Sequence, residues 1–140
     1  MQTPANTREL LHSHGIRPSV QRIAIMDYLL THRTHPTAEE VFEALVPDIP
    51  TLSKTTVYNT LNLFVSQGAA AHIAIDPRGS RFDGDTSVHG HFFCTKCGAL
   101  HDVFFASPPV LPLPEGGHAA ECAQIYYKGI CASCAGKREK

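Results

Sequence analysis

Four of the five cysteines form two Cys-x-x-Cys pairs, CTKC at 94–97 and CASC at 131–134. Two residues between the cysteines let both thiolates reach one ion from a tight turn, and two such pairs complete a tetrahedral zinc site. The intervening segment, 98–130, is longer than the roughly 15–20 residues of a zinc ribbon, so a strand and further structure are expected within it. Unrelated thiol pairs or a redox Cys-x-x-Cys are the alternatives. We predict one closed, structural zinc site formed by Cys94, Cys97, Cys131 and Cys134.

The length and net charge of the chain limit the number of domains and the classes of protein to consider. A chain of 140 residues holds one ordinary domain or two small ones, and its formal net charge of −1 gives no overall basic signature for nucleic acid. The sequence has no secretory signal and no apolar stretch of about 20 residues that would span a membrane. We therefore expect a cytoplasmic protein with no membrane partner, where clustered cysteines more often bind metal than form disulfides.

The first part of the chain carries the signals of four helices followed by a β-hairpin. Residues that can cap a helix are expected at the four starts: Thr7, Ser19, Thr37 and Ser53. Apolar side chains recur at helical spacing in the second of these segments, at Val20, Ile23, Met26 and Leu30. The run AAAHIAI, a DPRGS turn and RFD then predict a hairpin. Helices followed by a hairpin are typical of a winged helix-turn-helix.

The remainder predicts a smaller unit with strands in HGHFFC, ALHDVFF and AECAQIYYKGIC. Four prolines oppose a regular helix in residues 107–117. The expected fold class is α+β, with a winged-helix domain over 1–83, a linker over 84–88 and a metal-binding domain over 89–140. This last domain has little apolar core, so we expect its folding to depend on the zinc.

A second group of donors contains no sulfur. His89 and His91 share one face of a predicted strand because side chains alternate along a strand. Asp102 lies on a neighbouring predicted strand, and Asp83 ends the hairpin. Nitrogen and oxygen donors suit Fe(II), Mn(II) or Zn(II) rather than Cu(I). Taken alone, the pattern more commonly means a solvated strand face.

Several segments, in order and over nearly the whole chain, resemble the ferric uptake regulator (Fur) family: RPSVQR (17–22), HPTAEE (35–40), TTVYNTLNLF (55–64), GSRFD (79–83), HGHFFCTKCG (89–98) and YKGICASC (127–134). The resemblance implies a metal-dependent transcriptional regulator, expected to be a repressor and not an enzyme. It implies a homodimer, formed through a C-terminal α/β dimerisation domain, that binds a pseudo-palindromic double-stranded DNA operator. It also implies a regulatory Fe(II) or Mn(II) site formed by His35, Asp83, His89, His91 and Asp102. One ion held by both domains would select one domain arrangement.

The resemblance also bears on what is sensed. The peroxide-sensing (PerR-type) branch resembles this chain in having Asp on the hairpin, here Asp83, where iron-sensing members usually carry Glu. The sequence VHGH lacks the HHDH run of many iron- and zinc-sensing members. These features imply a peroxide sensor in which Fe(II) reacts with peroxide and a ligand histidine, His35 or His89, is oxidised. An iron sensor is the alternative.

The chain departs from the family pattern in two places. Residues 121–123, ECA, lack the histidine that serves an additional metal site in other members, so that site is not expected here. The proline-rich segment replaces a helix of the dimerisation domain, which puts the contribution of that helix to dimerisation in doubt. The leftover Cys122 is expected to be a buried strand thiol.

The fourth helix is the candidate for DNA recognition, because a dimer would place two such helices in successive major grooves. Polar residues off its apolar stripe are Thr55, Thr56, Tyr58, Asn59 and Asn62. Asparagine can read adenine, and threonine or tyrosine can contact phosphates or thymine methyls. Phosphates could be neutralised by Arg17, Arg22 and Lys54. For any one of these residues, an ordinary solvated helix face is the commoner role.

Two other classes of protein compete with the regulator. A zinc hydrolase needs an open zinc position and a general base, but four thiolates would fill this site. A zinc-stabilised protein-interaction adapter would explain the cysteine pairs, but it would leave the helical half and His35 without a role.

Overall fold

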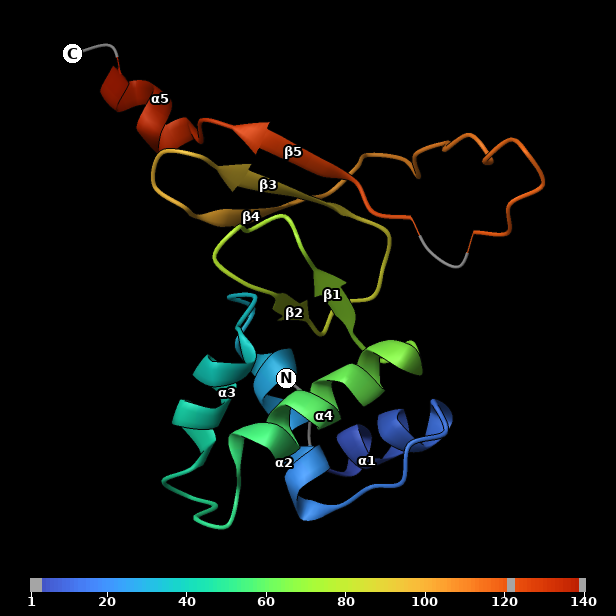
Figure 1. The fold of residues 1–140 in the computed structure, drawn as a ribbon, viewed down its shortest axis with the longest axis vertical. Coiled ribbons are helices and arrows are strands. Elements are labelled where there is room, and N and C mark those ends of the chain that lie inside the picture. Colours follow the sequence, from blue (N-terminus) through green and yellow to red (C-terminus); the bar gives the residue numbers. More distant parts are fainter. Residues whose placement is uncertain (1–3, 121–122, 139–140) are drawn as a thin grey trace. The chain divides into compact units, whose positions relative to one another are not determined.

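A computed structural model describes residues 4–120 and 123–138, so Cys122 lies outside the described residues. The chain forms two compact units that divide between Thr86 and Ser87 (Figure 1). This boundary falls inside the predicted linker, residues 84–88. The functions predicted for the domains on either side of it remain predictions.

The first unit begins with four helices, α1 (Pro4–Ser13), α2 (Val20–Thr31), α3 (Ala38–Leu45) and α4 (Lys54–Ser66). Three of the four predicted caps are confirmed. The Ser19 side chain accepts a hydrogen bond from the Arg22 backbone N–H, and that of Ser53 accepts one from the Thr56 backbone N–H. Thr37 forms a full capping box with Glu40, in which each side chain accepts from the other residue's backbone N–H.

Two details of the predicted helices are wrong. Thr7 does not cap α1, because the helix begins at Pro4, a residue favoured in the first turn. The Thr7 side chain is buried and its hydroxyl hydrogen-bonds the Asp27 carboxylate of α2. Val20 does not belong to the buried stripe of α2, because at the first helical position it lies at the surface and is 77% exposed.

A hairpin follows α4 and completes the winged helix. Gly68, with φ of 77°, takes the left-handed conformation that ends α4, and the Ala69 N–H closes the last turn on the Phe64 carbonyl at 2.8 Å. The hairpin strands β1 (Ala71–Ile73) and β2 (Arg81–Asp83) pair antiparallel. One apolar core holds the unit together, and it includes Ile25, Met26, Leu29, Val41, Val57, Leu61, Phe64 and Phe82.

The second unit is a three-stranded sheet with one short helix. Its strands β3 (Gly90–Cys94), β4 (Leu100–Val103) and β5 (Tyr126–Gly129) lie in the order β4-β3-β5. The first two pair antiparallel, whereas β5 runs parallel to β3. The helix α5 (Ala132–Arg138) was not predicted and starts between the two cysteines of the second pair. The strand before this helix, β5, spans only Tyr126–Gly129 and is shorter than the strand predicted from AECAQIYYKGIC.

The connection from β4 to β5 contains neither helix nor strand among its described residues, as the prolines of 107–117 predict. Figure 1 shows it as a long loop that leaves the sheet and returns to β5. The apolar core of this second unit is small. One cluster consists of Cys94, Cys131 and Cys134 with Phe92 and Ile130 packed on them, and Phe93 is also buried. None of the described helices has the length and apolar character needed to cross a membrane.

Candidate metal centres and DNA-binding surface

The four paired cysteines converge in the second unit. Cys94 ends β3, Cys97 lies in the turn that follows, and Cys131 and Cys134 lie at the start of α5. Their sulfur atoms all lie within 4.8 Å of one another, and the Cys97 and Cys131 Sγ atoms are 3.8 Å apart. Bonds of about 2.3 Å from a tetrahedral zinc to sulfur give sulfur–sulfur edges of about 3.8 Å. The donors and their spacing therefore fit a zinc ion.

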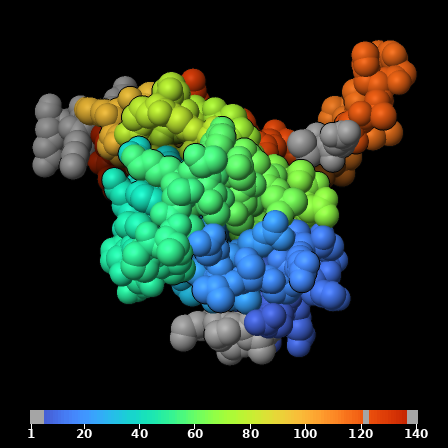
Figure 2. Space-filling model, turned by 60° about the horizontal axis from the view of Figure 1, so that its bottom comes forward, coloured from blue at the N-terminus to red at the C-terminus, as the bar shows by residue number. Residues whose placement is uncertain are grey.

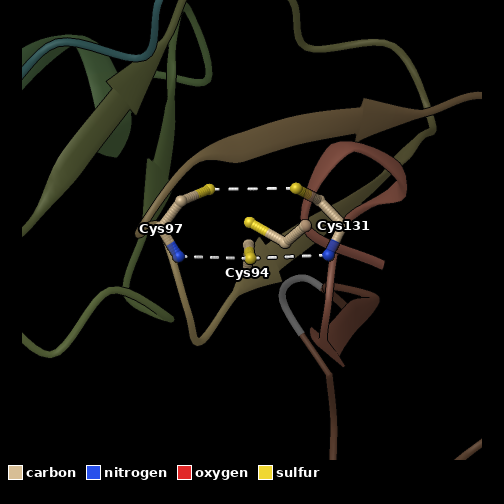
Figure 3. A group of neighbouring side chains, drawn as sticks. Cys94, Cys97 and Cys131 are labelled. Atoms are coloured by element: carbon tan, nitrogen blue, oxygen red, sulfur yellow. Dashed lines mark hydrogen bonds between the residues drawn. The ribbon is translucent and has the colours of Figure 1, made fainter. Parts of the chain in front are cut away.

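The backbone around these cysteines favours a thiolate before any metal is considered. The backbone N–H groups of Cys97 and Cys131 each donate to the Cys94 Sγ at 3.4 Å (Figure 3). These bonds lower the pKa of Cys94 to about 5. Burial, with the other three thiols as neighbours, raises the pKa of Cys134 to about 12. One sulfur is thus ready to bind as thiolate, while a buried neighbour needs a cation to lose its proton.

Three of the predicted nitrogen and oxygen donors also meet in the second unit. His91 and Asp102 are register partners on β3 and β4, and His89 immediately precedes β3. The Nε2 atoms of both histidines lie 3.4 Å from Asp102 Oδ1. The Nδ1 atom of His89 lies 2.8 Å from the Ser87 carbonyl oxygen, which directs its Nε2 toward the carboxylate. The neighbouring His101 is exposed, as strand alternation predicts.

The other two predicted ligands meet in the first unit. His35, in the loop before α3, and Asp83, the last residue of β2, are both buried, and His35 Nε2 lies 3.6 Å from Asp83 Oδ2. The second carboxylate oxygen, Asp83 Oδ1, accepts a hydrogen bond of 2.9 Å from the Asp85 backbone N–H. An ion pair of 2.8 Å between Arg33 and Asp85 joins the segments that carry the two ligands.

The distances in both sets suit metal ligands. Ligands about 2.1 Å from a four-coordinate ion are about 3.4 Å apart, close to the nitrogen–oxygen distances seen here. Imidazole and carboxylate groups suit Fe(II), Mn(II) or Zn(II). The two donors of the first unit and the three donors of the second unit are therefore both suitable as ligands of such an ion.

His35 is held in an uncommon backbone conformation. Its φ of 56° is the one positive value at a non-glycine residue in the described part of the chain. The following Pro36 disfavours the right-handed helical region for this residue. A left-handed non-glycine residue costs on the order of 1–3 kcal/mol, and such strain clusters at functional sites.

The proposed recognition helix exposes polar residues beside the start of α2. Arg17, Arg22, Thr56 and Asn59 line a shared surface hollow of about 500 Å³. In Figure 2 the green atoms of α4 and the blue atoms of α2 lie side by side on one face. Tyr58 is 51% exposed although it is aromatic.

The other four predicted DNA contacts, which do not line this hollow, also lie on α4: Lys54, Thr55, Tyr58 and Asn62. Thr55 and Asn62 are exposed. Lys54 lies at the first position of the helix, where its ammonium group is 3.4 Å from the Glu39 carboxylate. The hydroxyl of Ser53 donates to Thr56 Oγ1 at 2.8 Å, so Thr56 serves the helix start as well as the hollow. The structure thus brings together only part of the predicted set.

Comparisons with known proteins agree with this architecture. The family model described as the ferric uptake regulator family matches residues 13–109. The peroxide-responsive repressor PerR of Staphylococcus aureus (strain Mu50 / ATCC 700699) is 35% identical over 132 residues, which cover 91% of this chain and 88% of that protein.

Two solved structures share the fold. The ferric uptake regulator Fur of Helicobacter pylori superposes with a TM-score of 0.68 at 18% identity, covering 96% of this chain and 95% of that one. PerR from Streptococcus pyogenes superposes with a TM-score of 0.54 at 24% identity, covering 96% and 94%. These similarities confirm the α+β fold class with a winged helix and a small C-terminal α/β unit.

The chain belongs to the ferric uptake regulator family. It is therefore a metal-dependent transcriptional regulator. This assignment favours the regulator over the zinc hydrolase and the protein-interaction adapter.

Proposed function

We propose that this protein is a cytoplasmic, peroxide-responsive repressor that binds a pseudo-palindromic DNA operator as a homodimer. The observation that carries the proposal is Asp83, an aspartate at the end of the hairpin with its Oδ2 atom 3.6 Å from His35 Nε2. A hairpin aspartate is the ligand of the peroxide-sensing branch, and the similarity to PerR of Staphylococcus aureus over 91% of the chain supports the same branch.

In this proposal the protein holds two metals with separate tasks. The four thiolates bind Zn(II), which is structural because no coordination position is open. A regulatory Fe(II) or Mn(II) is bound jointly by five residues from the two units: His35, Asp83, His89, His91 and Asp102. Because neither unit supplies all five ligands, the ion binds most tightly to one arrangement of the units, and that arrangement binds the operator.

The chain's own residues would prepare the regulatory site for peroxide. Fe(II) held by these ligands would supply the electrons that reduce peroxide, and the chain would supply the histidine that is oxidised. His35 and His89 are the two candidates for that oxidation. An added oxygen would weaken the histidine as a ligand, the units would lose their shared ion, and affinity for DNA would fall. Mn(II) binds the same donors without this reaction, so it should keep the protein on DNA.

DNA binding is proposed to use α4 as the recognition helix. Asn59 and Asn62 would face base edges, whereas Thr55, Thr56 and Tyr58 would contact phosphates or thymine methyls. The cations Arg17, Arg22 and Lys54 would lie against phosphates.

A gel shift with operator DNA tests the proposal directly. Protein with its zinc in place is loaded with Fe(II) or Mn(II), exposed to low peroxide and assayed, and its peptides are analysed by mass spectrometry. The Fe(II) form should lose DNA binding and gain one oxygen on His35 or His89, and the Mn(II) form should do neither. His91→Ala should fail to bind the operator whether or not metal is added, whereas the matched control His101→Ala on β4 should behave like wild type.

The outcomes separate the possible functions. An Fe(II) protein that stays on its operator after peroxide, with no oxidised histidine, would move the chain to the iron-sensing branch. Failure to bind promoter DNA with any metal would favour the protein-interaction adapter. Metal-dependent DNA binding by His91→Ala at the wild-type level would rule out the second site altogether.

A further inference from the structure

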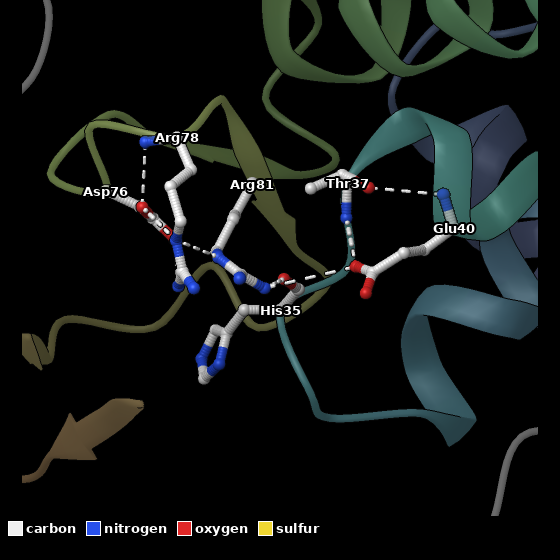
Figure 4. A network of polar contacts seen from close by, with 6 residues as sticks. All are labelled: His35, Thr37, Glu40, Asp76, Arg78 and Arg81. Atoms are coloured by element: carbon white, nitrogen blue, oxygen red, sulfur yellow. Dashed lines mark hydrogen bonds and ion pairs between the residues drawn. The ribbon is translucent and has the colours of Figure 1, made fainter. Parts of the chain in front are cut away.

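Arg81 joins the turn of the hairpin to the backbone of His35. Its Nε atom donates to Asp76 Oδ2 at 2.9 Å, and its Nη1 atom donates to the His35 carbonyl oxygen at 2.9 Å (Figure 4). The same Nη1 atom lies 3.9 Å from Glu40 Oε1, the carboxylate that completes the capping box of α3. One guanidinium therefore bridges the hairpin, the loop before α3 and the start of that helix.

The other end of this arrangement is anchored by a buried carboxylate. The Asp76 side chain is 1% exposed and accepts hydrogen bonds from the Arg78 backbone N–H at 2.9 Å and from Arg78 Nη2 at 2.8 Å, besides the bond from Arg81. The Arg78 side chain holds the pKa of Asp76 well below its usual range, and burial opposes this effect without reversing it. Asp76 is thus a fixed anion that sets the direction in which the Arg81 guanidinium points.

Strand β2 holds His35 at two places. Side chains alternate along a strand, so Arg81 and Asp83 share one face while Phe82 between them enters the core. Arg81 bonds the His35 carbonyl oxygen, and the Asp83 carboxylate lies 3.6 Å from the His35 ring. The Phe82 backbone N–H adds a bond of 2.9 Å to the Pro36 carbonyl oxygen. These contacts fix both the backbone and the imidazole of a residue whose φ of 56° is unfavourable.

We propose that Arg81 is a positioning residue for the regulatory metal, acting through the His35 backbone with Asp76 as its anchor. This inference rests on the proposed function, in which His35 is a ligand. Without Arg81, the loop would relax toward a negative φ and turn the imidazole away from Asp83. The metal would then find a poorly placed ligand even though every ligand side chain is still present.

The test measures metal affinity and fold separately. Mn(II) binding to zinc-loaded protein is measured by calorimetry, and melting is followed by circular dichroism without Mn(II). Arg81→Ala should weaken Mn(II) binding by roughly 10- to 100-fold, the usual effect of losing a group that orients a ligand. The matched control Arg78→Ala also removes a cation from Asp76 but keeps the bond to His35, and it should bind Mn(II) nearly as wild type does.

A double-mutant cycle separates positioning from general stability. In a His35→Ala background there is no imidazole to position, so adding Arg81→Ala should weaken Mn(II) binding no further. Arg81→Lys is the second variant, useful if Arg81→Ala melts too early. It keeps a cation beside Asp76, but a single ammonium does not reproduce the fork that serves both partners. It should melt close to wild type and still bind Mn(II) more weakly.

Each result has a defined meaning. Normal Mn(II) affinity in Arg81→Lys, or additive effects of Arg81→Ala and His35→Ala, would overturn the positioning role. An equal loss of Mn(II) affinity in Arg81→Ala and Arg78→Ala would also overturn the positioning role. If wild type takes up no Mn(II) beyond its zinc, or if His91→Ala binds Mn(II) as wild type does, the proposed function fails and the inference fails with it. Normal binding by wild type and loss in His91→Ala leave the Arg81 variants to decide the inference alone.

Discussion

Replacing Cys97 by serine should remove the zinc and unfold the second unit while the first unit stays folded. Cys97 is exposed, unlike the other three cysteines of the site, so the serine itself adds no buried polar group. The change removes one of four thiolates and little else. Any loss of structure then reports on the metal.

The second unit is expected to unfold without zinc because its apolar core is small. Outside the cysteines, Phe93 is the one large apolar side chain that is buried in its described part. Burying such a side chain contributes about 1.5–3 kcal/mol. Ordering the backbone of the five residues of β3 alone costs roughly 5–10 kcal/mol, at about 1–2 kcal/mol per residue. A structural zinc contributes about 10–16 kcal/mol, which is enough to reverse this balance.

The assay follows metal content and local structure in one sample. Zinc per chain is measured by elemental mass spectrometry, and hydrogen exchange is followed in peptides covering 90–103 and in peptides of the helical unit. Cys97→Ser should lose its zinc, exchange rapidly in the first set of peptides and elute as a monomer. Protection in α2 and α4 should be unchanged, because their core contains no cysteine.

The control is Lys96→Ser, an exposed position in the same turn that should keep its zinc and its protection. A Cys97→Ser protein that lacks zinc but still protects β3 and β4, and still dimerises, would refute the reasoning. It would mean that the apolar contacts of the sheet suffice, and that the metal is an addition to a unit that folds without it.

Three further predictions concern DNA, sensing and acid stability. Tyr58→Ala and Asn59→Ala should each weaken operator binding by about 1–3 kcal/mol if they contact bases, with metal content unchanged; footprinting at wild-type affinity would place recognition elsewhere. Asp83→Glu should still bind Fe(II) but respond less to peroxide in the gel shift; an unchanged response would remove the basis for the branch assignment. The pKa of Asp76 is lowered, chiefly by the Arg78 side chain, so its stabilisation is present above the ordinary value of 3.8 and is lost as pH falls further. Urea unfolding should therefore find Asp76→Asn less stable at neutral pH and less sensitive to acid; parallel pH profiles would contradict this.

The helix starts were predictable because capping is local chemistry. Ser19, Thr37 and Ser53 each accept a hydrogen bond from a backbone N–H three residues ahead, so the pattern is contained in four residues. The Thr7 prediction failed because a second start signal, Pro4, precedes it in the chain. The helix α5 was missed because its first residues lie inside CASC, where the metal-binding turn was the stronger pattern.

The sites were predictable only in part, for a similar reason. Strand alternation placed His89 and His91 on one face, but the pairing of His91 with Asp102 depends on the register between two strands. Nothing in the sequence pattern around His35 indicates its positive φ. The Arg81 side chain that reaches the His35 carbonyl comes from 46 residues further along the chain. Contacts at that separation arise from the tertiary fold and leave no periodic pattern to detect.

The two kinds of donor suit the two tasks proposed for them. A closed site of four thiolates within one unit contributes its binding energy to folding, so releasing that metal would cost the unit its structure. A regulatory ion must instead be lost without unfolding the protein. Moving a two-state equilibrium from 1:99 to 99:1 takes about 10⁴-fold tighter binding to one state, or about 5.5 kcal/mol. In the proposed site His35 and Asp83 supply that preference, because they add to the three ligands of the second unit only in one arrangement. Oxidation of one histidine would then remove the preference and leave both folded units intact.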